Sequence, residues 1–148
     1  MNFQGRKIIS DDDVKRIQEA ISQAEKRTSG EIRVHLEKKC VDKHGALSRA
    51  KKLFNQLEMY KTENRNGVII YVALEDHVFA IIGDKGIHEK VSADFWDCTK
   101  DLMAEYFKQG RIIEGIIAGI ERTGEKLKQY FPAETNDKNE LDDTVSFS

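Results

Sequence analysis

The stretch Val68-Ile69-Ile70-Tyr71-Val72-Ala73-Leu74 decides the fold, because it is continuously apolar and rich in β-branched residues. A run without polar alternation is typical of a central strand that is covered on both faces. The short polar turn 75–77 follows, and Val78–Ile82 then repeats the apolar pattern. The two runs therefore predict an antiparallel hairpin, which Gly83-Asp84-Lys85-Gly86 ends.

An alternating segment lies upstream of this hairpin, at residues 31–37. Ile32, Val34 and Leu36 fall on one side of it, and the polar residues Arg33, His35 and Glu37 fall on the other. This period-2 pattern predicts a half-buried strand. An amphipathic helix over residues 46–60 separates it from the central strand, so the two strands should be parallel and joined by a right-handed crossover.

Helices are predicted on either side of these strands. Ser10 and the acids 11–13 begin a helix whose apolar residues recur every three or four positions until Thr28-Ser29-Gly30. Two more helices follow the hairpin, one capped by Ser92 and one from residue 112 to just before Pro132. Gly115 and Gly119 in the last helix predict close backbone packing. The order αβαββαα indicates an α/β fold, a three-layer αβα sandwich whose mixed sheet carries helices on both faces.

Charge separates the domain from its tail. Residues 134–148 carry five acids and one base, a net charge of −4, and the whole chain carries −2, so residues 1–133 carry +2. This near-neutral body excludes the basic field of a nucleic-acid binder. We expect a lead over residues 1–9, a domain over 10–132 and an unstructured acidic tail over 133–148.

Cysteine content and hydropathy predict the compartment. Cys40 and Cys98 are too few for a disulfide framework and fit a reducing compartment, although one bridge between them stays open. The N-terminal residues do not have a signal-peptide pattern. Apolar runs reach about six residues, against the roughly 20 that span a bilayer. We expect a cytoplasmic monomer with no membrane span.

Three loops should meet at one edge of the sheet. Parallel strands begin at the same edge, and the antiparallel third strand ends there, which gathers residues 28–31, 64–67 and 83–86. The carboxylates of Glu31 and Asp84 suit Ca²⁺ or Mg²⁺. The basic side chains of Arg65 and Lys85, beside glycine amides, suit a phosphate.

The candidate site residues follow from this edge. Glu31 and Asp84 are the metal candidates, and the ligand or phosphate candidates are Ser29, Gly30, Arg65, Asn66, Gly67, Lys85 and Gly86. The alternative is that the three segments are ordinary turns, since their residues are common turn formers. A separate group, His35, Cys40 and His44, matches no paired zinc-ligand spacing.

Four motifs occur in order along the chain: Thr28-Ser29-Gly30-Glu31, the segment Asn66–Ala73, the hairpin and glycine turn 75–87, and the glycines 110, 115 and 119. Together they resemble the TPM domain family over about residues 10–132. The resemblance implies an αβα sandwich with a small cleft. In the family, one plant branch is credited with acid phosphatase activity and divalent-cation binding, and other members act as accessory proteins at membranes.

Two departures from the family pattern bear on function. Many members carry a signal sequence and a membrane anchor, and neither is seen here. Many carry Asp before Asn-Gly, where this chain has Arg65. We therefore expect a non-catalytic accessory domain that binds a protein partner, including one at a membrane, and that shares cation binding. The alternative is a weak cation-assisted phosphatase in which Glu31 and Asp84 hold the metal, while Arg65 and Lys85 position the phosphoryl group.

Overall fold

The central strand predicted from the apolar run is strand β2 (Gly67–Ala73), and all seven of its residues are buried in the computed structural model, which describes residues 9–133 and 145–148. Strand β1 (Glu31–Glu37) pairs with it in parallel over its whole length. Strand β3 (Val78–Gly83) pairs antiparallel on the other side. The predicted parallel pair and hairpin are both confirmed.

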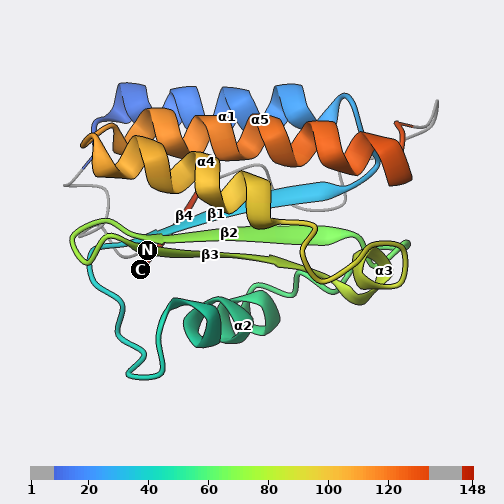
Figure 1. Cartoon of the computed structure of the whole chain (residues 1–148), viewed down its shortest axis with the longest axis horizontal. Coiled ribbons are helices and arrows are strands. Elements are labelled where there is room, and N and C mark those ends of the chain that lie inside the picture. The colour runs from blue at the N-terminus through green and yellow to red at the C-terminus, as the bar shows by residue number, and fades with distance from the viewer. Residues whose placement is uncertain (1–8, 134–144) are drawn as a thin grey trace.

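Helices cover both faces of this sheet, as the order of elements predicted (Figure 1). Helices α1 (Asp11–Glu25), α4 (Asp97–Lys108) and α5 (Ile112–Tyr130) lie on one face, and α2 (Ala46–Gln56) lies on the other. A four-residue helix, α3 (Lys85–His88), follows β3 and was not predicted. None of the helices in the described residues combines the length and the hydropathy of a membrane-spanning segment.

Side-chain alternation divides the interior into two apolar clusters, one on each face of the sheet. The larger cluster joins Ile32, Val34 and Leu36 of β1 to helices α1, α4 and α5. The smaller one packs Ile69 and Tyr71 of β2 against α2. Since β2 contributes to both clusters, it needs the continuously apolar sequence from which it was predicted.

The C-terminal residues differ from the prediction of an unstructured tail. Residues 134–144 lie outside the described residues, but Ser146–Phe147 form strand β4, which pairs in parallel with His35 and Leu36 of β1. The strand order is therefore β3-β2-β1-β4. Val145 is 3% exposed and belongs to the larger apolar cluster. The four residues that follow the acidic segment are anchored by this burial.

Two glycines set the spacing between α4 and α5, as the sequence indicated. A Cβ on Gly115 would lie 2.6 Å from Cε1 of Phe107, and a Cβ on Gly119 would lie 2.4 Å from Sδ of Met103. The Phe107 ring is itself held against Phe79, with ring centroids 5.1 Å apart. The approach of the helices therefore requires the absence of a side chain at Gly115.

We predict that Gly115→Ala destabilises the fold by about 1–2 kcal/mol, because overpacking against Phe107 outweighs the gain in helix propensity. Urea unfolding of the variant and the parent measures this difference. Ala118→Gly, on the same helix, is the control for propensity alone. An increase in stability for Gly115→Ala would contradict the close packing of α4 on α5.

Candidate functional site

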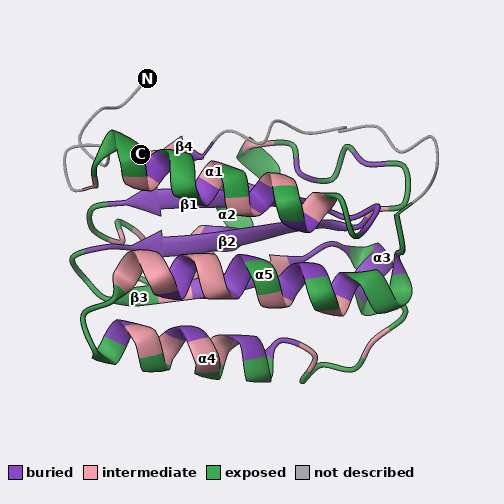
Figure 2. Ribbon diagram, turned by 90° about the horizontal axis from the view of Figure 1, so that it is seen from above, coloured by how far each residue is buried: buried purple, intermediate pink, exposed green. Residues whose placement is uncertain are grey.

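Backbone hydrogen bonds hold the three predicted loops side by side at the amino ends of β1 and β2. We call residues 28–31, 64–67 and 83–86 the three-loop edge; it lies at the end of the sheet next to α3 (Figure 2). The amide of Glu31 donates to Asn66 O at 3.4 Å, and the amide of Asp84 donates to Gly67 O at 2.9 Å. The amide of Gly86 donates to Arg65 O at 2.9 Å. The topological argument therefore placed these loops correctly.

The approach at Gly86 is closer than any other residue would permit. A Cβ there would lie 2.2 Å from Asn64 O and 2.6 Å from Arg65 O, both of which are backbone atoms. Backbone carbonyls cannot move aside as a flexible side chain can. Gly86 is thus explained by packing between two of the loops.

Burial distinguishes the candidate site residues from one another. Arg65 is half-buried and Lys85 is exposed, whereas the others are buried: Ser29, Gly30, Glu31, Asn66, Gly67, Asp84 and Gly86. Lys85 contributes its backbone amide, which donates to Asp84 Oδ1 at 2.7 Å. Only part of the predicted set can therefore reach a ligand in solvent without rearrangement.

A bidentate ion pair between Arg65 and Asp84 dominates the chemistry of the three-loop edge. Arg65 Nε donates to Asp84 Oδ2 at 2.7 Å, and Arg65 Nη2 donates to Asp84 Oδ1 at 3.1 Å. The hydrogen bond to Asp84 raises the pKa of the Arg65 guanidinium. Arg65 adopts φ +50°, a left-handed conformation that is costly for a residue with a side chain. The positive charge predicted to position a phosphate is thus already bound to the carboxylate predicted to hold a metal.

The remaining oxygens of this edge suit a hard cation. Asn66 is fully buried, and its Nδ2 lies 3.4 Å from Ser29 Oγ. Its Oδ1 is buried and accepts no hydrogen bond from the described residues. Carboxylate and amide oxygens are the ligands that Ca²⁺ and Mg²⁺ prefer. Among the described residues, however, no three His, Cys, Asp or Glu side chains gather closely enough to hold a metal by themselves.

A second polar group lies at the opposite end of β1, and sequence reasoning missed it. This Glu37 cluster comprises His35, Glu37, Arg49, Tyr71, Ser146 and Ser148. Arg49 Nη2 and Ser148 Oγ donate to Glu37 Oε1 at 2.8 and 2.7 Å, and the Tyr71 hydroxyl donates to Oε2. His35 Nδ1 lies 2.8 Å from Ser146 Oγ, and Nε2 lies 2.7 Å from Ser148 Oγ.

Burial of the Glu37 cluster corrects the expectation of a half-buried strand. His35 is 2% exposed and Glu37 is 3% exposed, although both were assigned to the polar side of β1. Helix α2 supplies Arg49, and β4 together with the residue after it supplies Ser146 and Ser148, so the polar groups are paired rather than solvated. Alternation alone could not show this, because the partners are as far as 113 residues away in sequence.

Burial and hydrogen bonding set the protonation states of the Glu37 cluster. Burial lowers the pKa of His35 to about 4, despite the opposing charge of Glu37. For Glu37, burial favours the neutral acid, but hydrogen bonds from Arg49, Tyr71 and Ser148 outweigh it and lower the pKa. Burial and the bond to Glu37 raise the pKa of Tyr71. At neutral pH the cluster holds a neutral imidazole beside an ionised Arg–Glu pair.

The Glu37 cluster contains serine, histidine and a carboxylate, but it is not arranged as a catalytic triad. In a triad the imidazole stands between the serine and the acid, so that the acid orients the imidazole. Here Glu37 binds Ser148, and both imidazole nitrogens face serine hydroxyls. The buried imidazole is also out of reach of a substrate. The arrangement secures β4 and does not activate a nucleophile.

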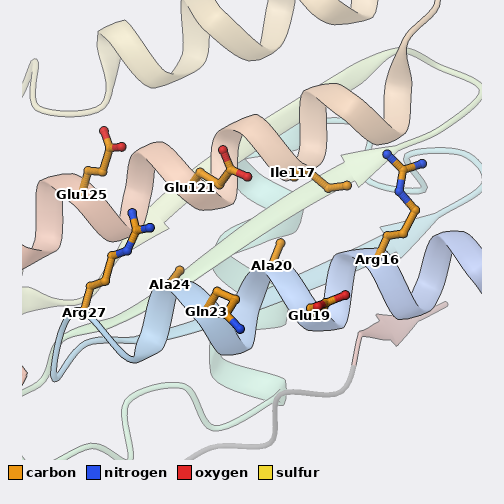
Figure 3. A pocket seen from close by; sticks show the side chains of 9 residues that line it. All are labelled: Arg16, Glu19, Ala20, Gln23, Ala24, Arg27, Ile117, Glu121 and Glu125. Carbon is orange, nitrogen blue, oxygen red and sulfur yellow. The ribbon is translucent and has the colours of Figure 1, made fainter.

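A groove of about 540 Å³ lies between α1 and α5 (Figure 3). Arg16 and Arg27 stand at its two ends, and Glu121 and Glu125 line its α5 side. Charges of both signs and the small side chains of α1 are typical of the solvated seam between two amphipathic helices. The predicted site residues do not line it.

Comparisons with known proteins agree with the fold and the motifs. The model of the TPM domain matches residues 3–126. The NMR structure of the BA42 protein from Bizionia argentinensis is 46% identical, covers 95% of each chain and superposes with a TM-score of 0.87. The N-terminal domain of the cg2496 protein from Corynebacterium glutamicum is 15% identical, with a TM-score of 0.63 over 88% of this chain and 78% of that one, and shows the fold alone. Among curated proteins none matches.

The lowered pKa of His35 predicts how stability depends on pH. The unfolded state binds a proton near pH 6.5, whereas the folded state does so only near pH 4, so the full stabilisation is present above about pH 6.5 and is lost as the pH falls toward 4. We expect His35 to account for a loss of roughly 2–3 kcal/mol. Urea unfolding at about pH 7, 6 and 5 measures it.

The control is His35→Gln, which removes the titrating group. The variant should be less stable overall, but its free energy of unfolding should change less over the same pH range. Equal pH profiles for the two proteins would show that His35 titrates normally in the folded state.

Proposed function

Because the chain belongs to the TPM domain family, we propose that it is a non-catalytic interaction domain that binds Ca²⁺ or Mg²⁺ at its three-loop edge. The observation that carries the proposal is the Arg65–Asp84 ion pair. Asp84 is 6% exposed and would be costly to bury as an unpaired charge. The guanidinium of Arg65 occupies the carboxylate of Asp84, to which a divalent cation would otherwise bind.

The exposure of the Arg65 side chain makes it feasible for a divalent cation to replace Arg65 on Asp84. The Arg65 side chain is 38% exposed, so its guanidinium can move into solvent without a large desolvation penalty. A divalent cation would then take the Asp84 carboxylate, with the Glu31 carboxylate and Asn66 Oδ1 as the further oxygen donors of this edge. Competition with Arg65 predicts weak binding in the parent protein.

We predict that Ca²⁺, and then Mg²⁺, shifts the amide resonances of residues in all three loops together: Gly30, Glu31, Asn66, Gly67, Asp84 and Gly86. Asp84→Asn should weaken this binding at least tenfold, because it removes the anionic ligand. Arg65→Gln should strengthen it about tenfold, because the competing charge is gone. Titration of ¹⁵N-labelled protein measures all three affinities.

The Arg65→Gln variant is a sharp test, because glutamine has a similar backbone preference at φ +50° and differs mainly in charge. A parent titration that moves only the acidic segment 134–144 would contradict cation binding at the three-loop edge. An unchanged affinity in Arg65→Gln would contradict the exchange of Arg65 for the cation.

The same ion pair weighs against the phosphatase alternative. Arg65 and Asp84 would have to act on a phosphoryl group and a metal, respectively, yet they neutralise each other. Lys85, the second proposed phosphate ligand, is an exposed lysine on the four-residue helix α3.

We predict that hydrolysis of a phosphate ester in the presence of Mg²⁺ is equally slow for the parent and for Asp84→Asn. The measurement is the release of nitrophenol from para-nitrophenyl phosphate. A Mg²⁺-dependent rate in the parent that Asp84→Asn abolishes would instead favour the phosphatase.

A further inference from the structure

The outer edge of β1 carries backbone groups that β2 does not use. Residues 31, 33, 35 and 37 turn their backbone groups toward β2, which leaves those of Ile32, Val34 and Leu36 for the other side. The Ile32 amide donates to the Glu25 carboxylate at 2.8 Å, and Leu36 O accepts from the Ser148 amide at 3.1 Å. In the described residues, β4 pairs with only two of the seven residues of β1.

Residues 145–148 make contacts beyond backbone pairing, because their side chains alternate between the larger apolar cluster and the Glu37 cluster. Val145 is buried in the larger apolar cluster, and Phe147 packs against the same cluster. Ser146 and Ser148 point to the other face, where His35 meets both hydroxyls. The outer edge of β1 thus favours apolar side chains at positions 145 and 147 and hydroxyl groups at positions 146 and 148.

Glu37 and Arg49 explain why the residue at position 148 needs a hydroxyl group. The Ser148 hydroxyl donates to Glu37 Oε1 at 2.7 Å and accepts from Arg49 Nη2 at 3.4 Å. Removing the hydroxyl would leave buried charged groups with a missing hydrogen bond, which costs more than the bond itself contributes. A side chain without a hydroxyl at this position is therefore disfavoured.

We propose that the outer edge of β1 is a strand-binding site for an extended segment of a partner protein, in which apolar residues alternate with serine or threonine, and that Val145–Ser148 occupies this site in the free protein. This inference rests on the proposed interaction role. Binding would add a parallel strand to the edge of the sheet, a common mode of peptide recognition.

A longer run of backbone pairing with β1 would allow a partner to displace the chain's own segment. The chain's own β4 binds its site intramolecularly, so a partner competes with an effective concentration of about millimolar. In the described residues, β4 pairs with two residues of β1. A partner segment that keeps the same alternation over seven residues would continue alongside Val34 toward Ile32. The added backbone hydrogen bonds offset the advantage of intramolecular binding.

The test uses the full chain and a fluorescein-labelled peptide, Thr-Val-Thr-Val-Ser-Phe-Ser, which extends the chain's own C-terminal sequence. Val145→Asp/Phe147→Asp releases β4 by placing carboxylates in the apolar cluster. Fluorescence anisotropy should show binding to this variant and at least tenfold weaker binding to the parent, in which the site is occupied. Replacing the last two serines of the peptide by alanine should weaken its binding at least tenfold.

A second variant, Ser146→Pro, releases β4 by removing a backbone donor and adds no charge, which guards against a folding defect in the first. Peptide binding should shift the amides of Val34, Leu36 and Arg49 in both variants. If neither folded variant binds the peptide, or if the serine-free peptide binds equally well, the proposal is overturned. A parent that dimerises by exchanging β4 would also overturn it, because the occupant would then be a second copy of the chain.

The same samples separate this proposal from the cation site. Ca²⁺ should still shift Asn66, Gly67 and Asp84 in the β4-released variants, since β4 pairs with His35 and Leu36, at the end of β1 away from the three-loop edge. Loss of peptide binding with an intact cation response would refute the strand site alone. The reverse result would refute the cation site alone.

Discussion

The burial of β2 on both faces is the constraint on which the rest of the structure depends. A seven-residue strand with no exposed side chain needs a neighbour on each edge and a helical layer on each face. Strands β1 and β3 supply the edges, and the two apolar clusters supply the faces. This arrangement leaves the two ends of the sheet, and the outer edge of β1, as the places where polar chemistry can gather.

Each end of the sheet holds an arginine–carboxylate pair, and the two pairs differ in exposure. At the Glu37 cluster the Arg49 side chain is 15% exposed and its carboxylate has further hydrogen bonds from Tyr71 and Ser148. At the three-loop edge the Arg65 side chain is 38% exposed. Breaking a buried pair leaves an uncompensated charge, whereas a half-exposed arginine can be solvated. The more buried Glu37 pair fits a structural role, and the more exposed Asp84 pair is the one for which exchange with a cation is proposed.

Local patterns in the sequence were sufficient for most of the fold. Continuous apolar character predicted β2, alternation predicted β1, and glycine spacing predicted the close contact between α5 and α4. Topology then placed the three loops together without any side-chain information. These inferences succeeded because each depends on residues close in sequence or on the direction of a strand.

The Glu37 cluster and β4 could not be predicted in the same way. Strand β4 has two residues, too few for a periodic signal, and it follows an acidic segment whose composition indicates no structure. The burial of His35 and Glu37 depends on serines more than 100 residues away. The pairing of Arg65 with Asp84 also depends on side-chain direction, so sequence alone left the choice between a site and ordinary turns open.

Strand β1 connects the two proposed sites, and its rigidity argues that they act independently. Its seven residues span roughly 20 Å, with Glu31 at one end and Glu37 at the other. Every residue of β1 is paired with β2, which holds the strand in one register along its whole length. Coupling between sites requires an element with two states that both ligands bias. A cation at the three-loop edge and a strand at the outer edge of β1 would therefore be bound by one rigid scaffold as two separate events.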